Sequence, residues 1–131
     1  MKIYFASFLE PENCGPGKKY AISHSKPDNF EVDGKVSYLT PTEDSLENYK
    51  IKQLEDQKTA ADFFNKAFYE RLKAVLIKLK SQAKAENKTE MELLPFKNGD
   101  TLLSWEREGN SNYRGTVAGL LKKIGYEVIL K

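Results

Sequence analysis

Apolar side chains recur at helical spacing along residues 59–85, and lysine, glutamate and arginine fill most of the intervening positions. This pattern predicts a long amphipathic helix that packs on a sheet. Thr59 and Asp62 resemble a capping box, so we expect the helix to begin near Thr59. The apolar positions are Phe63, Phe64, Ala67, Phe68, Leu72, Val75, Leu76 and Leu79.

Shorter runs rich in β-branched and aromatic residues predict strands. A second amphipathic helix is expected over residues 113–124, ended by Gly125 in a left-handed conformation. The last strand, helix and strand would then form a right-handed parallel crossover, so we expect one α/β domain over residues 1–131 with helices on the sheet faces. The predicted strands are 2–8, 20–25, 100–105 and 126–130, with 36–39 as a strand or an extended segment.

Composition and charge narrow the function classes. The chain has 21 basic and 19 acidic residues, a net charge of +2, which argues against a dedicated nucleic-acid binder. No apolar run approaches the roughly 18 residues of a membrane span. The start of the chain is typical of a strand rather than a signal peptide. The single cysteine, Cys14, excludes an internal disulfide, so a cytoplasmic location is expected.

The connection SWEREGNSNYRG, residues 104–115, carries more polar chemistry than a turn requires. It lies beyond the carboxyl end of a predicted strand, where α/β sheets bind ligands, and it opens a helix whose N–H groups favour an anion. Arg114 in the first helical turn opposes the helix dipole unless an anion or Glu106 compensates it. The candidate ligand-binding residues are Ser7, His24, Ser104, Glu106, Arg107, Asn112, Tyr113 and Arg114.

A structural explanation of the same residues stays open. Asn112 could serve only as the helix cap, Glu106 and Arg114 could pair only with each other, and Trp105 could belong to the core. His24, the only histidine, ends a predicted strand, and one histidine with scattered acids supports no Ser-His-Asp triad. No catalytic residue, metal site or cofactor is therefore expected.

Two further features could contribute to binding. The loop CGPGKK lacks the spacing of a P-loop, and we expect it to be a mobile loop that could close on an anion through Lys18 and Lys19. Cys14 in this loop is expected to be an inert thiol. Aromatic side chains could stack on a base, although most are expected in the core or at its rim. These aromatic residues are Tyr4, Tyr20, Phe30, Tyr38 and Tyr113.

The segment GDTLLSWEREGNSNYRGTVAGLLKKIGYEVIL resembles the C-terminal block of the domain of unknown function 488 family. That block has a strand, then Cys, an aromatic residue, Glu, Lys or Arg, a Gly-containing loop, and Cys-His-Arg at the start of a helix. KIYFASF, AISHSKP, YLTPTEDSLENYK and FNKAFYERLKAVLIKL resemble earlier segments. The pattern falls on Ser104, Trp105, Glu106, Arg107, Gly109, Asn112, Tyr113 and Arg114.

The resemblance implies a compact α/β domain with a Rossmann-like or flavodoxin-like sheet flanked by helices. Both Cys and the His of the family pattern are replaced, by Ser104, Asn112 and Tyr113, while Glu106 and Arg114 match. Because the usual atoms for Cys or His chemistry are gone, we favour non-catalytic binding over catalysis. The expected ligand is a small anion, foremost a nucleotide or nucleotide-derived signal.

Three functions follow from these observations as hypotheses. The first is a binding protein that sequesters such a ligand, as phage-encoded sponges of immune signalling nucleotides do. The second is an enzyme acting on a nucleotide or N-glycosidic bond with Glu106 as acid or base. The third is a protein-interaction domain whose polar loop is only well capped. A membrane partner is not expected and nucleic acid is disfavoured. A homodimer would fit the common pattern of assembly.

Overall fold

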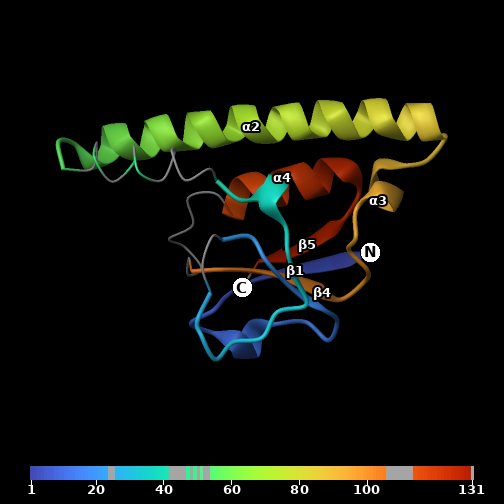
Figure 1. Cartoon of the computed structure of the whole chain (residues 1–131), viewed down its shortest axis with the longest axis horizontal. Coiled ribbons are helices and arrows are strands. Elements are labelled where there is room, and N and C mark those ends of the chain that lie inside the picture. Colours follow the sequence, from blue (N-terminus) through green and yellow to red (C-terminus); the bar gives the residue numbers. More distant parts are fainter. Residues whose placement is uncertain are drawn as a thin grey trace.

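The computed structural model is built around a five-stranded parallel sheet (Figure 1). It describes residues 1–23, 26–41, 47, 49, 51, 54–105 and 114–130. The strand order is β3-β2-β4-β1-β5, and every described strand pair is parallel. The strands are β1 (Lys2–Ser7), β2 (Lys19–Ala21), β3 (Gly34–Lys35), β4 (Asp100–Ser104) and β5 (Glu127–Leu130).

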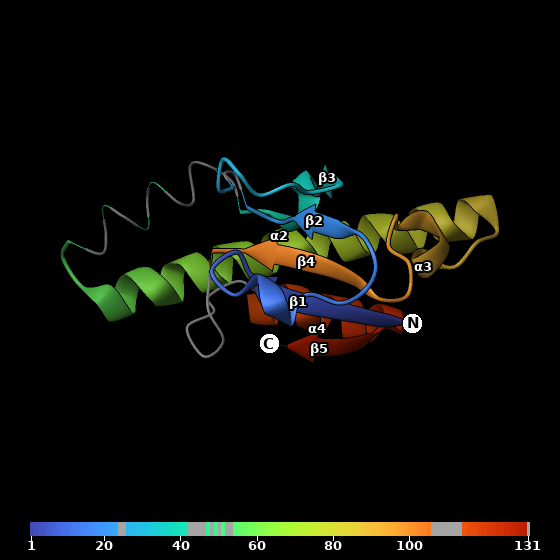
Figure 2. The ribbon, with the colours of Figure 1, turned by 90° about the horizontal axis from the view of Figure 1, so that it is seen from below.

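The described α-helices all lie on one face of the sheet. The long helix α2 crosses this face, and α4 lies beside it over β1 and β5 (Figures 1 and 2). The opposite face carries the short turn η1 and loops. The helical elements are η1 (Pro11–Asn13), η2 (Ser37–Leu39), α2 (Gln57–Glu86), α3 (Glu90–Leu93) and α4 (Arg114–Ile124).

Strand alternation divides the apolar side chains between these two faces. Phe5 and Leu102 point to the helices and join the main core, which includes Phe68 of α2 and Leu121 of α4. On the other face a smaller cluster contains Ala6, Phe8, Ala21 and Leu103, with Cys14, Phe30 and Val32 packed against it. Among the described residues, η1 and loops therefore cover the second face.

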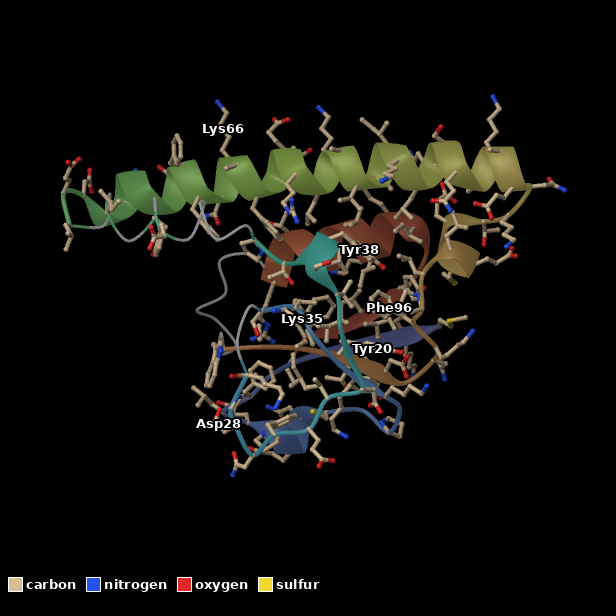
Figure 3. The ribbon with its side chains drawn as sticks, viewed as in Figure 1. Tyr20, Asp28, Lys35, Tyr38, Lys66 and Phe96 are labelled. Atoms are coloured by element: carbon tan, nitrogen blue, oxygen red, sulfur yellow. The ribbon has the colours of Figure 1, made fainter. Side chains whose placement is uncertain are left out.

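Aromatic contacts close the main core at the β2 side of the sheet. Tyr20 of β2 packs edge-on against Phe96, with ring centroids 5.4 Å apart (Figure 3). Phe96 in turn contacts Tyr126, the residue immediately before β5. Lys66 of α2 points the other way, away from the sheet (Figure 3). This polarity is what the amphipathic pattern of residues 59–85 requires.

The structure confirms the α/β class and the parallel sheet and corrects several details. The second strand is shorter than expected, Lys19–Ala21. The third strand is Gly34–Lys35, and residues 37–39 form the 3-10 turn η2 in place of a strand. The four residues 36–39, Val-Ser-Tyr-Leu, are too few to distinguish the two by periodicity.

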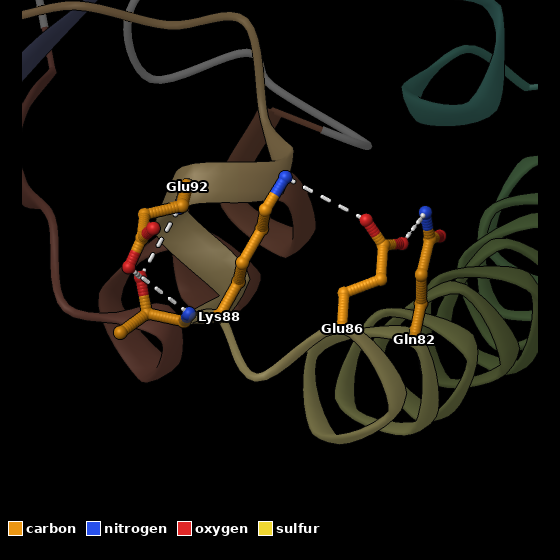
Figure 4. A network of polar contacts seen from close by, with 5 residues as sticks. Gln82, Glu86, Lys88 and Glu92 are labelled. Atoms are coloured by element: carbon orange, nitrogen blue, oxygen red, sulfur yellow. Dashed lines mark hydrogen bonds and ion pairs between the residues drawn. The ribbon is translucent and has the colours of Figure 1, made fainter.

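The start of α2 differs from the capping expected from the sequence. The helix begins at Gln57, and Asp56 is its N-cap, with a carboxylate that accepts a hydrogen bond from the Lys58 N–H at 3.1 Å. The expected box at Thr59 is wrong because Thr59 lies inside the helix. The true capping box opens α3, where Thr89 and Glu92 satisfy each other's backbone N–H groups (Figure 4).

Candidate functional site

The carboxyl ends of β1 and β4 meet at the centre of the sheet. The two strands are parallel neighbours, and their last residues, Ser7 and Ser104, are register partners. The Phe8 N–H donates to the Ser104 carbonyl at 2.9 Å, which extends the ladder by one bond. α4 leads from this edge back to the start of β5, so its N-terminus also lies at the carboxyl edge (Figure 1). The expected meeting of strand ends and helix start is therefore present.

Ser7 and Ser104 lie on the helix face of the sheet, because they follow Phe5 and Leu102 by two residues. Both are almost completely buried, at 1% and 0% exposure. The Ser7 hydroxyl accepts from the Leu9 N–H at 3.1 Å and lies 3.4 Å from the Trp105 carbonyl oxygen. The Ser104 Oγ makes no hydrogen bond within the described part of the chain. A buried hydroxyl without a partner is unusual and calls for an explanation.

Arg114 is the first residue of α4 and is only 1% exposed. It is the largest fully buried side chain among the described residues. A buried guanidinium requires compensating hydrogen bonds or negative charge, and its five donors can serve several partners at once. The helix dipole adds positive potential at the same place. Arg114 thus places a buried cation at the carboxyl edge of the sheet.

Trp105 follows β4 directly, and the structure does not support the alternative that it belongs to the core. It is 41% exposed. Its ring lies 5.3 Å from that of Phe8, which in turn meets Phe30 edge-on at 5.2 Å. These three aromatic residues lie on the loop-covered face, and Trp105 is partly exposed to solvent there. The sequence places Trp105 at the end of a strand. Strand alternation, however, does not predict the exposure of a side chain beyond the strand end.

The remaining candidate residues are not brought together by what the structure describes. Glu106, Arg107, Asn112 and Tyr113 lie outside the described residues, as does His24. Their roles stay predictions. Of the proposed set, the structure places Ser7, Ser104 and Arg114 at the carboxyl edge, and Trp105 follows Ser104 with its ring on the opposite face of the sheet.

The loop CGPGKK lies at the opposite, amino edge of the sheet and is firmly held. The Asp100 carboxylate accepts from the Lys18 N–H and from the Lys97 N–H, each at 2.8 Å. The Gly15 N–H donates to Thr101 Oγ1 at 2.8 Å. An added Cβ on Gly17 would overlap the Asp100 carboxylate. The expectation of a mobile anion-binding loop is wrong, because buried side chains of β4 already use its N–H groups.

The other aromatic candidates have structural places. Tyr20 and Tyr38 pack against the main core, and Phe30 packs against the smaller cluster. The ring of Tyr4 lies next to Gly15, where an added Cβ would meet it. Tyr113 lies outside the described residues. None of the four described rings presents the open surface that Trp105 does.

Cys14 is partly buried in the held loop. Burial raises the pKa of its thiol, and this outweighs the opposing effects of Lys19 and of the hydrogen bond with Thr101. The thiolate, which is the nucleophilic form, is therefore disfavoured. Within the described residues, no three His, Cys, Asp or Glu side chains cluster in a way that could hold a metal ion. No described helix is both long and apolar enough to cross a membrane.

Comparison with known proteins identifies no relative of this chain. No protein-family model, curated protein or solved structure matches the chain. The resemblance to the domain of unknown function 488 family is thus neither supported nor contradicted. The functional argument depends on the site itself.

Proposed function

We propose that this protein binds a small anionic ligand, foremost a nucleotide or nucleotide-derived signal, at the carboxyl edge of its sheet without converting it. The observation that carries the proposal is Ser104, whose buried hydroxyl has no described partner and lies beside Ser7 on the α4 face. A ligand oxygen would satisfy this hydroxyl. The position is the usual binding edge of a parallel α/β sheet.

Charge at the same edge favours an anion. Arg114 and the start of α4 supply a buried cation and the positive end of a helix dipole. A guanidinium holds phosphate or carboxylate through two parallel hydrogen bonds, which a neutral ligand cannot match. Glu106, Arg107, Asn112 and Tyr113 follow in the same connection and would add a ribose acceptor, a second cation and polar contacts.

The exposed indole of Trp105 favours a nucleotide among small anions. Its ring adjoins Phe8 and remains 41% exposed. A base stacked on an aromatic side chain gains about 1–3 kcal/mol without sequence preference. The chain keeps Arg107 and Arg114 but has Ser104, Asn112 and Tyr113 where the pattern that it resembles has Cys and His. This difference favours binding over catalysis. The role we propose is therefore sequestration of a signalling nucleotide.

A thermal-shift screen of nucleotides, cyclic nucleotides and ADP-ribose derivatives tests the proposal. We expect at least one ligand to stabilise the wild-type protein. Ser104→Ala should keep the fold, because its hydroxyl has no described partner, and should weaken that ligand about tenfold or more. Arg114→Lys keeps the charge but loses the bidentate geometry and should weaken binding similarly. Trp105→Ala should weaken a nucleotide more than inorganic phosphate.

The matched control is Ser81→Ala, which removes an exposed hydroxyl of α2 and should bind as wild type. Each stabilising ligand is recovered after denaturation and weighed by mass spectrometry. Recovery of a product would replace binding by an enzymatic function. No stabilisation by any compound, or undiminished binding in both Ser104→Ala and Arg114→Lys, would contradict the proposed site.

A further inference from the structure

A pocket of about 290 Å³ lies between α2 and α4. Leu72 and Leu76 of α2 and Leu120 of α4 contribute apolar walls, and Tyr69 lines it with a half-exposed ring. Among the described candidate residues, Ser7, Ser104 and Arg114 do not line this pocket. It is therefore a second feature that the proposed function does not use.

Two glycines of α4 leave the pocket open. Gly115 and Gly119 both line it, and a Cβ added to either would meet no described atom within 4 Å. Glycine inside a helix is unfavourable relative to alanine, and close packing is its usual structural reason. Close packing does not apply to Gly119, because space is available there. Because Gly119 has no side chain, the space between α2 and α4 stays open.

The charges around the pocket are of one sign. Lys73 of α2 and Lys123 of α4 line it, and both side chains are exposed. No acidic side chain lines the pocket within the part of the chain that the structure describes. Neither ammonium group forms an ion pair with a carboxylate of the described chain. Two flexible cations thus flank an apolar wall from opposite helices, which complements a ligand with one anionic end and one apolar end.

We propose that the α2–α4 pocket binds a small carboxylate with an aryl or alkyl body. The pocket volume corresponds to about ten water-sized volumes, so a ligand of about a dozen heavy atoms matches it. The apolar body lies against Leu72 and Leu120, next to Gly119. Lys73 and Lys123 bind the carboxylate at the solvent side. The side chains that form this site differ from Ser7, Ser104 and Arg114, although Gly115 and Thr116 of the first turn of α4 line the pocket.

The test is an NMR titration of ¹⁵N-labelled protein with 4-phenylbutyrate, matched by the neutral 4-phenylbutanamide. We expect saturable shifts centred on the amides of Gly119 and Leu120, and at least fivefold tighter binding of the carboxylate than of the amide. The double variant Lys73→Met/Lys123→Met should lower carboxylate affinity to that of the amide. Lys78→Met, which removes an exposed α2 lysine outside the pocket, is the control and should bind as wild type.

Gly119→Leu tests the volume separately. Its side chain enters open space, so the melting temperature should stay or rise while affinity for 4-phenylbutyrate falls at least tenfold. Undiminished binding in Gly119→Leu, equal binding of acid and amide, or shifts centred elsewhere would overturn the proposal. A dimer in sedimentation that Gly119→Leu abolishes would also overturn it, because a second copy would then occupy the groove. Nucleotide binding is unaffected by any of these outcomes.

Discussion

At the residue scale, Tyr126 illustrates how the fold changes the chemistry of one group. Its side chain is 4% exposed, and its hydroxyl makes no hydrogen bond with any described residue. Burial, followed by the neighbouring Tyr38 and Asp100, raises the pKa of Tyr126 to about 12. The folded protein therefore keeps this phenol neutral at a pH where an unfolded chain ionises it.

Tyr126→Phe should alter the alkaline stability of the protein in a defined direction. Because the folded pKa is raised, the unfolded chain loses its proton first, and folding stability falls as the pH rises from about 10 towards 12. The variant lacks this proton and should lose less unfolding free energy over that range. At pH 7 it should be as stable as wild type or more so, since an unpartnered buried hydroxyl is removed. Urea denaturation of wild type and variant at pH 7 and between about pH 10 and 12 measures the unfolding free energy. An identical dependence on pH in the two proteins would contradict the prediction.

At the scale of elements, the end of α2 is set by local chemistry rather than by packing alone. Asn87 adopts the left-handed conformation at the helix end, with φ of 55°. Thr89 then opens α3 through its capping box with Glu92, and Lys88 forms an ion pair with Glu86 at 3.6 Å (Figure 4). The sequence TEME, residues 89–92, carries this box.

Thr89→Ala should cost about 1 kcal/mol of folding stability, because the Glu92 N–H loses its hydroxyl acceptor at the start of α3. Thr89→Ser keeps that acceptor and should stay close to wild type. Chemical denaturation of the three proteins measures the difference. Equal losses in Thr89→Ala and Thr89→Ser would show that the methyl group, not the cap, is responsible.

At the scale of the whole molecule, the two edges of the sheet have different tasks. The amino edge is closed by Asp100, which holds the loop before β2 and the turn before β4 through two backbone N–H groups. The carboxyl edge carries the buried Ser104 and Arg114 and the exposed Trp105. The amino edge therefore joins the loop before β2 to the turn before β4, and the carboxyl edge carries the proposed site.

Asp100→Ala should destabilise the protein by about 2–4 kcal/mol, because two N–H groups lose a charged acceptor in a part-buried setting. Asp28→Ala removes an exposed loop carboxylate (Figure 3) and should stay within about 0.5 kcal/mol of wild type. Urea denaturation compares the variants. A small effect in Asp100→Ala would mean that water replaces the carboxylate and that the loop is less firmly held than its contacts indicate.

The sequence by itself determined the elements whose pattern is periodic or strongly apolar. Residues 59–85 and 114–124 are helical, and the first and last strands lie where their β-branched and aromatic residues indicate. Period and propensity are local properties, so they can be read without a fold. The α/β class and the place of Ser7, Ser104 and Arg114 at one edge follow from this order, because parallel strands share their carboxyl edge.

Only the tertiary structure decided what depends on partners far along the chain. The short strand β3 is defined by its pairing with β2, and Asp100 holds the Gly/Pro loop from 82 residues away. The exposure of Trp105, the burial of Arg114 and the pocket beside Gly119 arise where separate elements meet. Burial and hydrogen bonding are properties of such meetings, so a local pattern of residues cannot specify them.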